Sequence, residues 1–123
     1  MGASALIIAQ AGPLRDGLHA LVDTMPQIGS VDVIGDVDFA FGPTFNQCPA
    51  LVLLDTHLTE DNVWLAVRRV KRKWPRARTI VLAGNVEQQE AAEAAGADVV
   101  LLQGLPAGRL VAAIVRLLPQ PFM

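Results

Sequence analysis

The chain has 123 residues, of which 52% are hydrophobic, and its formal net charge is −2. This length and composition fit one ordinary domain, residues 1–123, with a substantial core and no signature of disorder. The small net charge excludes a general attraction to nucleic acid or to an anionic membrane, and no apolar run approaches the roughly 18 residues that would cross a bilayer.

Cysteine content and the N-terminal segment indicate the cellular compartment. Cys48 is the only cysteine, so neither an internal disulfide nor a multi-cysteine metal site is possible. The N-terminal segment has no basic residue before its apolar run, unlike a secretory signal. We therefore expect a protein of the reducing cytoplasm with no membrane partner.

Short apolar runs alternate with helical patterns along the first half of the chain. The runs at 5–9, 31–35 and 51–55 are typical of strands. A helical spacing of i, i+4, i+7 and i+8 separates the first two, at Leu14, Leu18, Leu21 and Val22. A second helix belongs in residues 36–49, but a Gly-Pro pair interrupts the pattern, so we expect a short or broken element there.

The second half of the chain continues the same alternation. Apolar spacing predicts a helix over 63–74, which Pro75 stops. A β-rich run at 79–84 is followed by an alanine-rich helix over 86–96, with Gly96 just beyond its last turn. A last strand at 98–102 and a closing helix over 107–118 complete the chain.

This order is a strand followed by a helix, five times. It predicts an α/β fold with a parallel sheet covered on both faces and right-handed crossovers. In open parallel sheets, function gathers where the strands end at their carboxyl termini. Those ends carry Ala9, Gln10 and Ala11, then Asp55, then Ala83 and Gly84, and finally Gln103 and Gly104.

Four stretches carry a resemblance to a known family: "LIIAQAGPLRDGL", "PALVLLDTHL", "KWPRARTIVLAG" and "AAGADVVLLQG". Together they resemble the CheY-like receiver domain of response regulators. The closest likeness is to two-component regulators of the LuxR or NarL type, which carry a helix-turn-helix output domain. The resemblance implies a doubly wound sheet of five parallel strands in the order 2-1-3-4-5, here with a short or broken second helix.

The resemblance also implies a chemistry. A working receiver accepts a phosphoryl group from a histidine kinase on an aspartate at the end of the third strand, and Asp55 matches that position. An acidic pair after the first strand helps to hold Mg²⁺, a Thr or Ser follows the fourth strand, and an aromatic residue and a Lys belong to the fifth strand and its end. At these positions the sequence has Gln10 and Ala11, Ala83, Val100 and Gln103.

These departures predict a degenerate receiver that does not turn over phosphate at Asp55. One carboxylate with the amide oxygen of Gln10 is a thin ligand set for Mg²⁺. Each lost electrostatic element costs roughly 3 kcal/mol of barrier, so two losses cost several orders of magnitude in rate. We expect no catalytic residue, no metal and no cofactor. Two alternatives stay open: a weakly phosphorylatable receiver that uses Asp55, and a flavodoxin-like domain whose neutral pocket binds a small ligand.

The expected partners are proteins, including a second copy of the chain. In the family, the face of the fourth helix, fifth strand and fifth helix often forms dimers, which here is the 86–118 face. Its charged residues could pair across a two-fold axis: Glu87, Glu90, Arg109 and Arg116. No direct nucleic-acid partner is expected.

Seven of the ten basic residues lie within 68–78. They are either a docking patch for an acidic partner or nucleic acid, or a solvated helix face, and we favour the latter. His57 follows Asp55 in "DTHLTE", which loosely matches a cobalamin-binding pattern; an ordinary loop histidine is the simpler interpretation.

Overall fold

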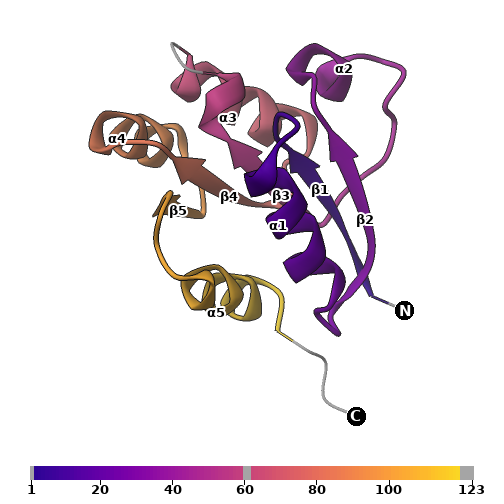
Figure 1. The fold of residues 1–123 in the computed structure, drawn as a ribbon. Helices are drawn as coiled ribbons and strands as arrows, with labels where there is room; N and C mark the ends of the chain where they lie inside the picture. The colour runs from indigo at the N-terminus through magenta and orange to yellow at the C-terminus, as the bar shows by residue number, and fades with distance from the viewer. Residues whose placement is uncertain (1, 60–61, 120–123) are drawn as a thin grey trace.

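Five parallel strands form one sheet in the order β2-β1-β3-β4-β5 (Figure 1). The computed structural model describes residues 2–59 and 62–119. The strands are β1 (Ala3–Ile8), β2 (Ile28–Ile34), β3 (Leu51–Asp55), β4 (Arg78–Ala83) and β5 (Val99–Leu102). All five residues of β3 are buried, as its unbroken apolar run requires for a strand covered on both faces. The predicted fold class and strand order are confirmed.

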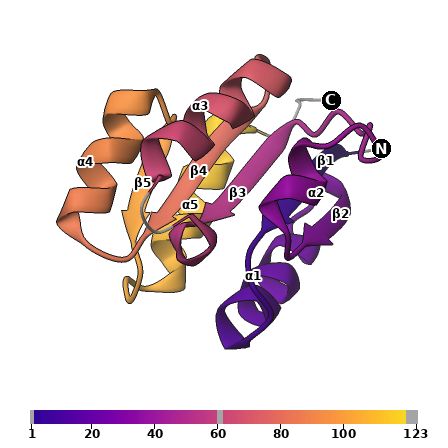
Figure 2. The same ribbon diagram turned by 90° about the horizontal axis from the view of Figure 1, so that it is seen from above.

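Helices cover both faces of this sheet (Figure 2). They are α1 (Pro13–Asp23), α2 (Val37–Phe41), α3 (Val63–Lys73), α4 (Val86–Ala95) and α5 (Ala107–Leu117), and a 3-10 turn, η1 (Thr56–Leu58), follows β3. One core cluster joins β1, β3 and β4 to α2, α3 and α4, and a second joins the opposite side of these strands to α1 and α5. Among the described residues no helix is both long and apolar enough to cross a membrane.

The second helix is short, as the Gly-Pro pair predicts. α2 has five residues and ends at Gly42, and the chain from there to Ala50 is irregular. The end of α3 holds this irregular segment in place. The ammonium of Lys73 donates to the carbonyl oxygens of Ala40, Gly42 and Phe45 at 2.8, 3.0 and 2.9 Å, and the indole nitrogen of Trp74 donates to the carbonyl of Gln47 at 3.0 Å.

Two element ends show where local sequence does and does not determine the boundary. Gly96 takes the left-handed conformation (φ 102°) that ends α4, as its position after the alanine-rich run predicts. The predicted start of the second strand, at residue 31, is wrong, because β2 begins at Ile28. The backbones of Gly29 and Gly2 approach so closely there that a Cβ on Gly29 would lie 2.8 Å from the Gly2 nitrogen. Pairing with β1 therefore sets this boundary.

Candidate functional site

Asp55 is the last residue of β3, the central strand, and so lies in the middle of the carboxyl edge of the sheet. Its side chain is only 1% exposed. A buried carboxylate needs partners because removing it from water without them is costly. The question for this site is which groups supply them.

Three nitrogen atoms lie within hydrogen-bond distance of one oxygen of Asp55. Its Oδ1 accepts from the backbone nitrogen of His57 at 3.0 Å and lies 3.0 Å from the Nδ1 of the same residue. The side-chain amide of Gln103 donates to it at 3.0 Å. The tautomer of His57 with its proton on Nδ1 is the one that donates to a carboxylate, because an ionised carboxylate only accepts. Asp55 thus anchors the start of η1 and the end of β5 at once.

Gln103 is the strand-end residue that closes the site from the β5 side. Its Nε2 also donates to the carbonyl of Leu82 at 3.1 Å, and its backbone nitrogen donates to the carbonyl of Ala83 at 2.8 Å. The amide therefore bridges β3, β4 and β5 without adding charge. An amide at this position satisfies the carboxylate by hydrogen bonding alone, where a lysine would add a cation.

A second network, which the sequence analysis missed, occupies the β4 side of the site. The Oε1 of Gln88, on α4, accepts from the hydroxyl of Thr56 and from the backbone nitrogen of Gly84, both at 2.7 Å. Asn85 and Gln88 have the spacing of a capping box, and the Asn85 side chain does cap α4 by accepting from the Gln88 backbone nitrogen. The spacing of Asn85 and Gln88 is the feature of the sequence that could have pointed to this network. It predicts that a helix starts there, but it does not predict that the Gln88 side chain reaches Thr56.

The remaining predicted site positions are not joined to Asp55. Gln10 and Ala11 are exposed beyond the end of β1, and no hydrogen bond links either to Asp55 within the described ranges. Ala83 is fully buried at the end of β4. Val100 is half-buried and packs into the core on the side of α3 and α4. Of the predicted set, Gln103 is the residue that the structure joins to Asp55 by a hydrogen bond among the described residues.

No family model and no curated protein matches the sequence, whereas several solved structures are similar to this chain. A response regulator from Thermotoga maritima is similar in structure, with a TM-score of 0.79 and 15% identity over 98% of this chain and 100% of the other. A LuxR-family response regulator from an Aurantimonas species gives 0.81 and 21%, over 96% and 86%. A LuxR-family DNA-binding response regulator from Silicibacter pomeroyi gives 0.75 and 24%, over 94% and 91%.

The chain has the response-regulator receiver fold. Proteins with this fold that transfer phosphate use Mg²⁺, but the residues present at this site do not suit that ion. Among the described residues, no three His, Cys, Asp or Glu side chains are grouped so that they could hold a metal ion. Within residues 2–59 and 62–119, Asp55 is the acidic residue that stands at the end of a central strand, and its Oδ1 already accepts from His57 and Gln103. A hard cation that wants several oxygen ligands finds too few here.

The four charged residues predicted to form an interface lie on the helices that flank β5. Glu87 and Glu90 are on α4, and Arg109 and Arg116 are on α5. All four are exposed. α4 and α5 cover opposite faces of the sheet and flank β5, its edge strand, from the two sides (Figure 2). Glu87 lies on the side of α4 that meets the start of α3.

The basic run at 68–78 is less solvated than predicted. Lys73 is half-buried and bonded to three carbonyls, which contradicts a solvated role for this residue. The guanidinium of Arg69 lies 4.4 Å from the centre of the Phe41 ring. Lys71 and Arg78 approach Asp98 at 3.6 and 3.8 Å. Much of this charge therefore holds neighbouring segments to α3 and β4.

Proposed function

We propose that this chain is a degenerate receiver: a non-catalytic signal-transduction module that acts through protein–protein contacts, without Mg²⁺-dependent phosphotransfer. The observation that carries the proposal is the setting of Asp55, whose Oδ1 is hydrogen-bonded to His57 and to the uncharged amide of Gln103, with no cluster of metal-binding side chains among the described residues. The side chain of Asp55 is 1% exposed. The receiver fold supports the signalling role. The hydrogen bonds of Asp55 to His57 and Gln103 support the proposal that this residue does not take part in phosphotransfer.

Phosphoryl transfer to Asp55 needs positive charge that this arrangement does not supply. The carboxylate oxygen must approach the phosphorus in line, while cations offset the charge on the equatorial oxygens. Here the backbone nitrogen of Gly84, at the end of β4, already donates to Gln88 instead of being free for a phosphoryl oxygen. The uncharged amide of Gln103 stands at the position where the resemblance implies a lysine. Losing a cation from such a site costs about 3 kcal/mol, or roughly a hundredfold in rate, before the burial of Asp55 is counted.

The partner that we propose is protein, with a second copy of the chain as the first candidate. The α4–β5–α5 face has two exposed valines, Val86 on α4 and Val115 on α5, which are 56% and 48% exposed. The acidic pair on α4 and the two arginines on α5 are complementary in charge. A two-fold axis would set the α4 of one copy against the α5 of the other and so use both features.

An NMR titration tests the absence of chemistry. Beryllofluoride mimics an acyl phosphate and needs Mg²⁺ and a free aspartate oxygen. We expect no saturable shift of the backbone amides of Thr56, Gly84 and Gln103 when both are added to the ¹⁵N-labelled chain. Saturable shifts at these amides, absent in an Asp55→Asn variant, would favour the alternative of a weakly phosphorylatable receiver.

A further inference from the structure

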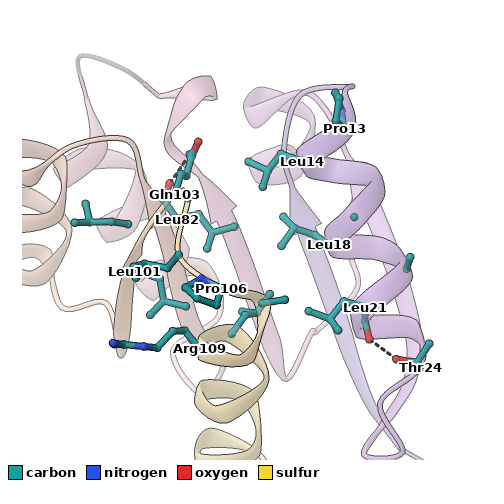
Figure 3. A pocket seen from close by; sticks show the side chains of 17 residues that line it. Pro13, Leu14, Leu18, Leu21, Thr24, Leu82, Leu101, Gln103, Pro106 and Arg109 are labelled. Atoms are coloured by element: carbon teal, nitrogen blue, oxygen red, sulfur yellow. Dashed lines mark hydrogen bonds between the residues drawn. The ribbon is translucent and has the colours of Figure 1, made fainter.

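An apolar cleft of about 580 Å³ lies between α1 and α5. Its walls are α1 on one side and the β5–α5 loop with the first turns of α5 on the other, and the ends of β4 and β5 form its floor (Figure 3). α1 and α5 cover the same face of the sheet (Figure 1).

The cleft is deep as well as apolar. Leu18, Leu82 and Leu110 line its inner part and are 5–6% exposed. Leu14 and Leu105 also line the cleft and are more exposed, at 36% and 43%. Water in such a space has almost no hydrogen-bonding partner, so an apolar molecule would replace it favourably.

The side-chain donors of Thr24 and Gln103, which line the cleft, are already hydrogen-bonded within the protein. The hydroxyl of Thr24 donates to the carbonyl of Leu21 at 2.7 Å, and the amide of Gln103 is bonded to Asp55 and to Leu82. Arg109 is the one charged lining residue, and Figure 3 shows its side chain running away from α1. Nothing in the lining therefore favours a charged ligand.

We propose that this cleft is a binding site for a small, uncharged, apolar molecule. The volume lies within the range of roughly 300–1,000 Å³ that is usual for ligand pockets, which are mostly apolar. The ligand would touch Leu82 and Gln103. The carbonyl of Leu82 and the amide of Gln103 belong to the hydrogen-bond network around Asp55. A ligand bound in the cleft would therefore alter the surroundings of Asp55 at the carboxyl edge of the sheet. That use of the ligand as an input rests on the proposed function, whereas binding itself does not.

Two glycines offer a matched pair of variants. Gly17, on α1, lines the cleft, and a Cβ added there meets no atom within 4 Å. Gly108, on α5, has the same open space but does not line the cleft. Leucine at either position replaces a helical glycine and should maintain or raise stability. Only Gly17→Leu places a side chain in the cleft.

The test uses the neutral fluorescent probe N-phenyl-1-naphthylamine, which brightens in apolar surroundings. We expect saturable one-to-one binding to the wild type and to Gly108→Leu, and at least tenfold weaker binding to Gly17→Leu. Absent or non-saturable binding to the wild type, or equal binding to Gly17→Leu, would overturn the site.

A second readout separates binding from its use as an input. In the ¹⁵N-labelled wild type, we expect the probe to shift the side-chain amide of Gln103 together with the amide of His57. Binding without any shift at these two residues would preserve the site and overturn its link to Asp55.

Discussion

At the scale of single residues, Asp55 holds the carboxyl edge of the sheet together. A cluster of acidic groups at such an edge would repel one another and destabilise the fold. In the part of the chain that the structure describes, Asp55 belongs to no such cluster, and it accepts from His57 and Gln103, which come from the segments after β3 and β5. Its negative charge is therefore offset by donors, and the carboxylate stabilises the native state.

Replacing Asp55 by alanine should therefore lower the free energy of unfolding by about 2–4 kcal/mol, because buried donors lose their acceptor. Urea denaturation followed by circular dichroism measures this. Asp32→Ala, at an exposed position on β2, is the control and should change stability by less than about 0.5 kcal/mol. An Asp55→Ala protein as stable as the wild type would show that these hydrogen bonds do not hold the edge.

At the scale of elements, the end of α3 stabilises the segment that the sequence leaves least defined. α2 is too short to be stable alone. Lys73 and Trp74 bind the carbonyls of α2 and of the irregular chain that follows it. Phe45 packs edge-on against Trp74 with ring centres 6.1 Å apart. These contacts replace the helix–sheet packing that a longer second helix would provide.

A Lys73→Met variant keeps the side-chain length but removes three hydrogen bonds. We expect a loss of about 2 kcal/mol in unfolding free energy and faster hydrogen exchange confined to residues 36–49. Arg72→Met is the matched control, since Arg72 is exposed on the same helix and no hydrogen bond or ion pair to it occurs within the described ranges. Equal effects of the two changes would refute the role of Lys73.

Local pattern predicts the elements but not the contacts between them. The run at 51–55 is apolar because β3 is covered on both faces, so its existence and type could be read directly. The start of β2 could not, because Gly29 and Ser30 are exposed at the sheet edge and carry no apolar signal. The pairing of Gln88 with Thr56, 32 residues apart, depends on how α4 crosses β4. Asp55 and Gln103 were both predicted at the site, but the hydrogen bond between them required the fold.

At the scale of the whole molecule, we expect self-association through the α4–β5–α5 face. A Glu87→Arg, Glu90→Arg variant should dimerise at least about tenfold more weakly, a change of about 1.4 kcal/mol, because like charges would face each other. Adding Arg109→Glu and Arg116→Glu should restore the dimer. Light scattering coupled to size exclusion measures both, and a wild-type chain that stays monomeric would refute this interface.

The most direct test of the central claim, that Asp55 is a structural acceptor and not a phosphoacceptor, is the intact mass of the wild-type chain after incubation with acetyl phosphate and Mg²⁺. A variant that regains the missing groups (Gln10→Asp, Ala11→Asp, Ala83→Ser and Gln103→Lys) serves as the positive comparison. We predict no phosphoryl adduct on the wild type. A stoichiometric, hydroxylamine-sensitive adduct that disappears in Asp55→Asn would contradict the account.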